Sequence, residues 1–317
     1  MLMSFVAGVV ILRSKTSHAP KNNKTPKAQA HFPAASTTSP PTASLTTASI
    51  LSQFQFESAL LHTDLAAVLY SPPGPTPFSP DRIAFVTQHV QLRVFLTTDT
   101  PSVLLINAHG NPIPRSESSL ISARLVSSLL AATTTEGLKA TIITAAFFCG
   151  EHRPVARDVY AAPAEATMSL LLQVVAAWGR FDAAELDWIR GNLDPTDVRR
   201  VCAVFEGVVQ RLPAALVVFV VVDGLDFFSE PPEREAEMTE VVRMLVGLSR
   251  DGNGVRARVK VLFVGATRAR FVEEEMREAE MLDVPRFCPP AGDPGAVFGM
   301  GPGQGGQGPS GVGMLEY

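Results

Sequence analysis

The sequence contains only three cysteines, Cys149, Cys202 and Cys288, and they lie far apart in a chain of 317 residues. Small secreted domains that depend on disulfides carry many more cysteines at close intervals. The sequence therefore gives no disulfide framework, and a reducing compartment is expected. Cys149 and His152 have the spacing of a metal-ligand pair, but no second pair accompanies them, and a structural zinc site needs four ligands. We expect a buried thiol beside an exposed histidine instead.

Long apolar runs are missing as well. No run reaches the roughly 18–20 residues that a membrane-spanning helix needs. The apolar stretch at residues 2–12 is too short, and its basic residues follow it, whereas a secretory signal places them first. The first acidic residue is Glu57, so the chain begins with a basic, Ser/Thr-rich leader. We predict a cytoplasmic protein without a membrane span, with an organelle-targeting leader as the alternative.

Charge of either sign is scarce. Charged residues make up 18% of the chain and hydrophobic residues 46%, and 27 Lys and Arg stand against 31 Asp and Glu, which gives a net charge of −4. Nucleic-acid-binding proteins usually carry a basic patch or surplus. No nucleic-acid partner is therefore expected, and the apolar content is sufficient for a large core.

The most informative stretch, residues 216–228, reads LVVFVVVDGLDFF. Seven apolar residues are followed by Asp223 and, three positions later, by Asp226. A strand that is apolar on both faces must be covered on both faces, which is typical of a central strand in a parallel sheet flanked by helices. A carboxylate at the carboxyl end of such a strand lies where open α/β sheets bind ligands. The stretch therefore indicates a fold of the nucleotide-binding type.

The rest of the chain alternates strands and helices, which favours an α/β fold with a doubly wound parallel sheet. Residues 83–96 alternate loosely, which indicates an additional strand. Asp194 and Pro195 predict a helix start, as N-cap and first helical residue. Ser116 or Ser118 is available as the N-cap of an earlier helix. Apolar runs and helical spacing predict strands at residues 103–106, 141–148, 216–222, 259–264 and 281–284, and helices at residues 54–70, 120–130, 167–178, 195–212 and 238–248.

Several of these segments resemble one family. The strand and loop at residues 103–119, the stretches at 142–150 (IITAAFFCG) and 194–213, the acid strand, and residues 259–268 (VKVLFVGATR) follow the order of P-loop NTPases of the STAND class. The pattern is similar to the NACHT-like domains of filamentous fungi. The resemblance implies a site for ATP or GTP with Mg²⁺. In it, Asp223 would be the Mg²⁺-linked Walker B acid, Asp226 a second, catalytic acid, and Thr267 or Arg268 the γ-phosphate sensor.

The phosphate loop departs from the family pattern. That pattern is GxxxxGK followed by Ser or Thr, whose backbone N–H groups wrap the phosphates while the lysine neutralises their charge. Counted from Gly110, Arg115 replaces the second glycine, Ser116 the lysine and Glu117 the hydroxyl residue. The two prolines of the loop remove N–H donors. Gly110, Arg115 and Ser116 are therefore the candidate nucleotide-binding residues of a degenerate Walker A loop.

His109 and Gly110 also imitate the oxyanion segment of α/β-hydrolases. That class needs a GxSxG elbow after an apolar strand and a triad histidine late in the chain. The chain has no GxSxG elbow after an apolar strand, and no histidine comes late in it, since His152 is the last of the six histidines. We interpret His109 as an ordinary loop residue.

Composition and the resemblance together divide the chain into four segments. We predict a disordered leader at residues 1–50, a helical or irregular lead-in at 51–100, a P-loop NTPase-like α/β domain at 101–288 and a disordered Gly/Pro-rich tail at 289–317.

Three functional hypotheses remain open. The first is a degenerate P-loop domain that no longer hydrolyses nucleotide, needs no cofactor, and acts as a regulatory or protein-interaction module. The second is a weak Mg²⁺-dependent ATP- or GTP-binding NTPase in which Arg115 replaces the lysine. The third is a truncated gene product without independent function. We favour the first, with protein partners whose identity the sequence does not give.

Overall fold

The computed structural model describes residues 45–70, 78–133, 141–153, 157–250 and 255–288. The tail predicted to be disordered lies outside these residues, as does the leader up to residue 44. Within the described part, helix α2 begins at Thr47, inside the segment assigned to the leader.

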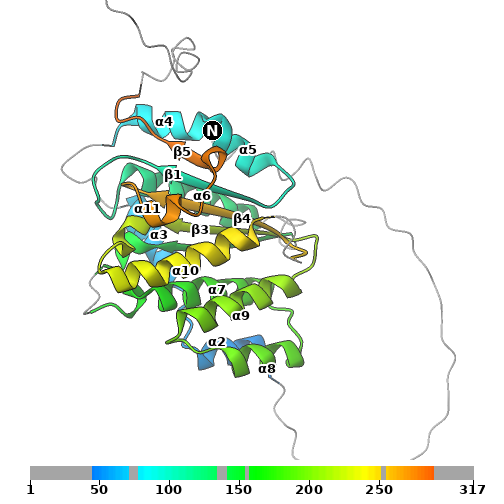
Figure 1. Cartoon of the computed structure of the whole chain (residues 1–317). Helices are drawn as coiled ribbons and strands as arrows, with labels where there is room; N and C mark the ends of the chain where they lie inside the picture. The colour runs from blue at the N-terminus through cyan, green and yellow to red at the C-terminus, as the bar shows by residue number, and fades with distance from the viewer. Residues whose placement is uncertain (1–44, 71–77, 134–140, 154–156, 251–254, 289–317) are drawn as a thin grey trace, which may run out of the picture.

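Five parallel strands form one sheet in the order β2-β3-β4-β1-β5 (Figure 1). All hydrogen-bonded pairs of strands run parallel, so the predicted parallel sheet is confirmed, including its short edge strand. The acid-bearing strand β3 is interior, between β2 and β4, and β4 holds the middle position. The strands are β1 (Ser102–Asn107), β2 (Ile142–Phe148), β3 (Val217–Asp223), β4 (Arg258–Gly265) and β5 (Met281–Asp283).

Strand β3 illustrates why the sequence locates this sheet. Val218, Val220 and Val222 are buried in the core on one face, and Phe219 and Val221 in the core on the other. Because successive side chains of a strand point to opposite faces, a strand covered on both sides must be apolar at every position. The uninterrupted apolar run is the direct consequence.

Three long helices cover one face of the sheet: α7 (Pro163–Trp178), α9 (Val198–Arg211) and α10 (Pro232–Leu248). Helix α7 packs on β2 and α9, and α10 packs on α7, α9 and β4. Two further helices, α2 (Thr47–Gln53) and α8 (Ala183–Asn192), form an outer layer against α7 and α9 (Figure 1).

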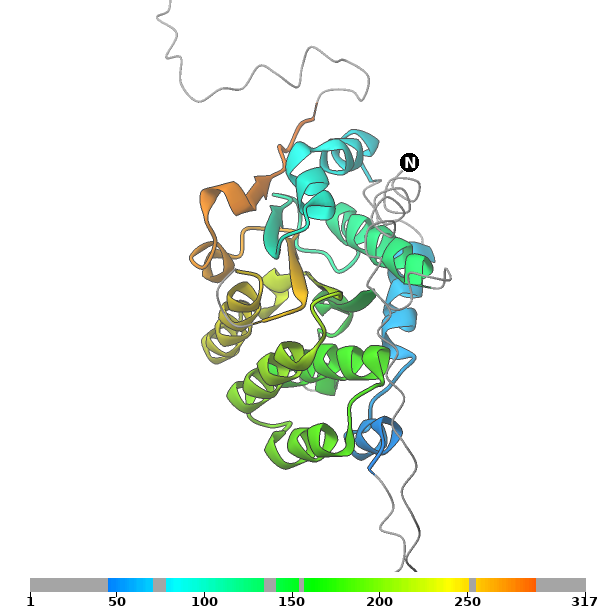
Figure 2. The same cartoon turned by 90° about the vertical axis from the view of Figure 1, so that its right-hand side faces the viewer.

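Helix α6 (Glu117–Thr133) covers the opposite face and packs on β2, β3 and β4. Figure 2 shows the sheet between α6 on one side and α10 on the other. Helices α3 (Leu60–Tyr70) and α4 (Pro80–Gln88) pack on α6, and α5 (Val90–Thr97) packs on β1. None of the helices in the described ranges is long and apolar enough to cross a membrane.

The short elements are α11 (Arg270–Glu273), η1 (Cys149–Glu151), η2 (Val159–Ala161), η3 (Leu225–Phe228) and η4 (Glu278–Glu280).

The strand predicted at residues 83–96 is wrong, because the chain forms helices α4 and α5 there. The Ser79 side chain accepts a hydrogen bond from the N–H of Arg82, and Pro80 occupies the first helical position. His89 caps α5 in turn. Both helices are short, and a brief apolar pattern does not distinguish a short helix from a strand.

The predicted N-cap of α9 is also wrong. The helix begins at Val198, and the cap is Asp197, whose carboxylate accepts hydrogen bonds from two N–H groups of the first turn. Asp194 instead accepts hydrogen bonds from the N–H and the hydroxyl of Thr196 in the preceding turn. Both acids have capping chemistry, and the sequence alone did not separate them.

Candidate functional site

The predicted site residues gather at the carboxyl edge of the sheet. The strand register places Phe148, Asp223 and Val264 side by side at the ends of β2, β3 and β4. Strand β1 ends beside β4 at the same edge. Because parallel strands end together, the segments that follow them surround one region. Residues 108–116 cross this edge from β1 to α6.

Several backbone donors of this β1–α6 loop are used within the protein. The Gly110 N–H donates to the Ala266 carbonyl at 2.7 Å, and the Ile113 N–H donates to the Asn111 carbonyl at 2.8 Å. The two prolines between Asn111 and Arg115 have no N–H. A phosphate-binding loop needs successive N–H groups that point to one anion. The prolines and these two hydrogen bonds therefore remove Gly110 and residues 112–114 from such a set of donors.

Arg115, the cation of the loop, forms a bidentate ion pair with Glu151 of η1. Its Nε donates to Glu151 Oε1 at 3.0 Å, and its Nη2 donates to Oε2 at 2.9 Å. Paired hydrogen bonds between a guanidinium and a carboxylate are among the stronger polar contacts in proteins. The positive charge of Arg115 is therefore paired with a carboxylate in the turn that follows β2.

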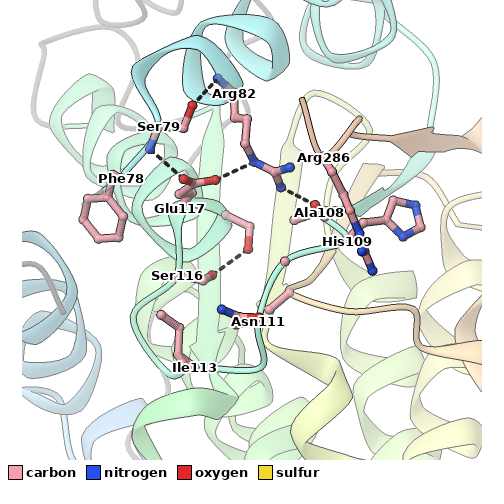
Figure 3. A pocket seen from close by; sticks show the side chains of 13 residues that line it. Phe78, Ser79, Arg82, Ala108, His109, Asn111, Ile113, Ser116, Glu117 and Arg286 are labelled. Atoms are coloured by element: carbon pink, nitrogen blue, oxygen red, sulfur yellow. Dashed lines mark hydrogen bonds and ion pairs between the residues drawn. The ribbon is translucent and has the colours of Figure 1, made fainter. Parts of the chain in front are cut away.

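Ser116 and Glu117 form the start of helix α6. The Ser116 Oγ accepts a hydrogen bond from the Ser119 N–H at 3.1 Å, so Ser116 is the residue that caps the helix. Glu117 accepts hydrogen bonds from the Ser79 N–H and from Arg82 Nε, each at 2.6 Å (Figure 3). Glu117 stands where the family pattern has a hydroxyl residue, and here it joins α6 to the start of α4.

Asp223, the predicted magnesium ligand, is 1% exposed. Its Oδ1 accepts a hydrogen bond from Ser122 Oγ at 2.9 Å, and its Oδ2 has no hydrogen-bond partner in the part of the chain that the structure describes. Burial raises the pKa of Asp223 to about 7, although the hydroxyls of Ser119 and Ser122 oppose the shift. A carboxyl group removed from water without a cation beside it favours its neutral form.

Asp226, the predicted catalytic acid, fixes the segment that follows β4. Its Oδ1 accepts a hydrogen bond from the Ala266 N–H at 3.1 Å, and its Oδ2 accepts one from Thr267 Oγ1 at 3.3 Å. Arg268, the other sensor candidate, donates to Glu273 at 2.8 Å. The structure thus brings Asp226 and Thr267 together, through a hydrogen bond that uses both side chains.

Two glycines permit close packing at this edge. A Cβ on Gly150 would lie 2.8 Å from both the Cα and the carbonyl oxygen of Pro114, so the loop rests directly on the end of β2. Gly224, which follows Asp223, has a φ of 74°, a conformation that glycine adopts without steric cost. Its N–H donates to the Val264 carbonyl at 2.8 Å.

A cavity of about 440 Å³ opens beside the loop (Figure 3). Its titratable wall residues are Arg82, His109, Glu117 and Arg286. Two of the predicted site residues contribute to the wall, namely Gly110 and Ser116. Its wall includes none of the other predicted site residues, which are Arg115, Asp223, Asp226, Thr267 and Arg268. The cavity therefore does not face the two acids.

Two arginines of this cavity were not predicted. Arg82 donates to Glu117, to the Pro285 carbonyl at 2.7 Å and to the Ala108 carbonyl. Arg82 and Glu117 are 35 positions apart, so no local spacing links them. Arg286 is exposed just beyond β5 and forms no ion pair with any residue that the structure describes.

His152 was expected to be exposed, and this prediction is wrong: the residue is 5% exposed. Its Nδ1 lies 2.9 Å from Asp158 Oδ2, its Nε2 lies 3.1 Å from Asp64 Oδ2, and its ring stacks on Phe147. Burial lowers the pKa of His152, but the hydrogen bonds and charges of Asp64 and Asp158 outweigh it and leave the pKa above its ordinary value. The two elements joined in this way are α3 and the segment after β2.

The residues at the carboxyl edge do not fit a magnesium triphosphate. Glu117 adds negative charge at the start of α6, and Asp223 is buried against a serine hydroxyl. Arg115 is the arginine of the loop itself that could oppose phosphate charge, and it is bound to Glu151.

Comparison with known proteins gives a similarity to a solved structure. No protein-family model matches the chain, and no curated protein matches it. Among solved structures, the chain is similar to that of the Aeropyrum pernix ORC1 protein in complex with DNA, with a TM-score of 0.36 and 15% sequence identity. The match covers 70% of this chain and 49% of that chain, so it spans about half the length of the ORC1 protein.

Proposed function

We propose that this chain is a degenerate P-loop domain of the NACHT/STAND kind that does not hydrolyse nucleotide and acts by binding protein partners. The observation that carries the proposal is the ion pair between Arg115 and Glu151. Arg115 is the only basic residue between Gly110 and Glu117. A triphosphate needs a free cation in this loop. The single candidate, Arg115, is held in an ion pair within the protein.

The layout of the sheet supports the P-loop ancestry. Strand β1 leads through the loop into α6, and the acid strand β3 ends in Asp223 at the same edge. The carboxyl group of Asp223 contacts Ser122 in that helix. Such a link between the acid strand and the helix after the loop is compatible with a former metal site. The groups that would bind metal and phosphate now contact each other or other parts of the protein.

Phosphate release tests the loss of hydrolysis. The purified full chain and an Asp226→Asn variant would be incubated with ATP or GTP and Mg²⁺. We expect the two proteins to release phosphate at the same background rate. Release that falls by roughly a hundredfold in the variant, the usual effect of losing a general base, would contradict the proposal.

A second candidate function is metal-independent binding of an anionic small molecule, which includes a nucleotide, in the cavity beside the loop. Arg286 and His109 line this cavity, as do residues of the first turn of α6, and a helix N-terminus favours an anion. The test is ATP binding measured without Mg²⁺. An affinity that falls in Arg286→Ala and is unchanged in Asp223→Ala would support this candidate, and no binding would exclude it.

We also propose a reducing, cytoplasmic environment and partners that are proteins rather than nucleic acids. The three cysteines are free thiols, and Cys149 and Cys202 are buried. The net charge of −4 supports a partner that does not need a basic surface. Fractionation of tagged protein would test the compartment.

A further inference from the structure

A second cavity, of about 280 Å³, lies between the α2–α3 connection, η2 and α7. It shares no wall residue with the cavity beside the loop. Much of its wall is apolar or aromatic, and these side chains come from segments far apart in the sequence. They are Phe54, Phe56, Leu60, Tyr160, Met168 and Leu172.

Two carboxylates stand in this apolar wall without a basic partner. Glu57 accepts a hydrogen bond from the Tyr160 hydroxyl at 3.4 Å. Glu165 is half-buried in the first turn of α7, and burial raises its pKa. No lysine or arginine of the described residues forms an ion pair with either acid. Glu57 is exposed, so the cost of a half-buried carboxylate without a cation falls on Glu165.

The carboxylates near Tyr160 act on its hydroxyl group. Burial raises the pKa of its hydroxyl, and the charges of Glu57, Glu165 and Asp158 raise it further. Asp158 already pairs with His152, so Glu57 and Glu165 are the acids left for a ligand. Aromatic rings next to carboxylates are the chemistry that recognises a cation with an apolar stem.

The backbone at the rim is strained. Gln55, between the two phenylalanines of the wall, has a φ of 51°. A non-glycine residue in this left-handed region is uncommon, and such residues concentrate at binding sites. Val159, also in the wall, is 70% exposed. When a side chain of a ligand enters the cavity, this exposed apolar side chain is placed to contact the ligand residue next to it.

We propose that this cavity receives the arginine side chain of a partner protein, with an apolar residue next to it in the partner's sequence. Glu57 and Glu165 would accept hydrogen bonds from the guanidinium group, and the aromatic wall would contact its planar faces. Arginine is favoured over lysine because its flat, delocalised group stacks on rings and bridges two carboxylates. Val159 would contact the neighbouring apolar residue.

This inference rests on the proposed role as an interaction module and names the chemistry of the partner. It involves none of the residues of the β1–α6 loop. Failure of the peptide experiment below would leave the nucleotide measurements unchanged, and the reverse also holds, so the two failures can be told apart.

The test uses a library of short peptides with one fixed central residue and mixed flanking residues, and it measures binding to the full chain by fluorescence polarisation. The central residue is arginine, lysine, citrulline or glutamate. Citrulline keeps the shape of arginine and removes its charge. We expect arginine to bind best and citrulline roughly tenfold or more weakly, as expected for loss of a charge-assisted hydrogen bond. Leucine or isoleucine is expected to be selected beside arginine.

The matched variants place the effect in the cavity. The double variant Glu57→Gln/Glu165→Gln should bind arginine and citrulline peptides equally. The control Glu233→Gln/Glu237→Gln removes the same charge from exposed positions of α10 and should keep the preference. Absence of binding, equal binding of arginine and citrulline by the wild-type protein, or a preference that survives in the cavity variant would overturn the proposal. Agmatine, a free guanidinium compound, binding more tightly than every peptide would overturn the assignment to a protein segment.

Discussion

The guanidinium of Arg115 and the carboxylate of Glu151 form two hydrogen bonds, at 3.0 and 2.9 Å, between the β1–α6 loop and the end of β2. The Glu151 side chain is 12% exposed and that of Arg115 is 44% exposed. This pair fixes the loop to the neighbouring strand and occupies the one cation that the loop contains. The same contact therefore accounts for the position of the loop and for its poor fit to a triphosphate.

The first prediction concerns the energy of this pair. Arg115→Ala and Glu151→Gln should each lower the free energy of unfolding by about 1 kcal/mol, because a bidentate pair at a partly exposed site contributes in this range. The double variant should cost less than the sum of the two, with a coupling of roughly 0.5–1 kcal/mol. Urea denaturation of the four proteins measures the coupling. Strict additivity would show that the contact contributes nothing to stability.

The second prediction concerns the packing of Pro114 on Gly150. Gly150→Ala would place a methyl group 2.8 Å from backbone atoms of Pro114, so the loop or the strand end must move. We expect a loss of about 1–3 kcal/mol in the free energy of unfolding. Gly191→Ala is the matched control, since a Cβ there meets nothing within 4 Å. The control should be neutral or slightly stabilising because alanine favours helix. Equal effects of the two substitutions would contradict the packing described.

The third prediction follows from the pKa of Asp223, which burial raises to about 7 from an ordinary value of 3.8. Between these two pH values the folded protein holds a proton that the unfolded chain has released. Stability therefore falls as the pH rises through this window and levels off above about pH 7.

Asp223→Asn stays neutral and should escape this loss. Relative to wild type, the variant should gain roughly 4 kcal/mol in unfolding free energy between about pH 4 and pH 8. Asp187→Asn, at an exposed position of α8, serves as the control and should follow wild type. Parallel curves for wild type and Asp223→Asn would mean that Asp223 is ionised in the folded protein over this range, as it is in the unfolded chain.

The fourth prediction concerns His152, which lies between Asp64 and Asp158. Burial lowers the pKa of His152, but the two acids raise it more, so the folded value exceeds 6.5. The stabilisation by the charged ring is complete below pH 6.5 and is lost as the pH rises through the folded pKa. His152→Asn should therefore cost about 1 kcal/mol more at pH 6 than at pH 9.

Chemical denaturation at the two pH values measures this difference. His62→Asn, at an exposed position of the same helix that carries Asp64, is the control and should cost the same at both. A cost for His152→Asn that does not change with pH would show that the ring has the same pKa in the folded and unfolded protein, and a larger cost at pH 9 than at pH 6 would show that the folded protein keeps the ring neutral.

The sheet could be predicted because its signal is local. Apolar runs such as residues 217–222 are the direct result of burial on both faces, and all five strands were located from them. The short helices α4 and α5 were missed, because two turns of helix and a loosely alternating strand share similar apolar spacing.

The site was predictable in its residue types and not in its contacts. Asp223, Asp226 and Thr267 were selected from their positions after strands, and they do lie at one edge of the sheet. The hydrogen-bond partners of the buried side chains come from distant positions in the sequence. Asp226 contacts Thr267, 41 residues away, and His152 contacts Asp64, 88 residues away. Such pairs depend on the packed fold, and no spacing in the sequence announces them.

Isothermal titration calorimetry of ATP against the full chain, with and without Mg²⁺, tests the central claim most directly. The account predicts that Mg²⁺ adds no binding heat and no affinity, for wild type and for Asp223→Ala alike. Stoichiometric binding that requires Mg²⁺ and disappears in Asp223→Ala would contradict it, and would show that the acid strand still holds a metal against a bound triphosphate.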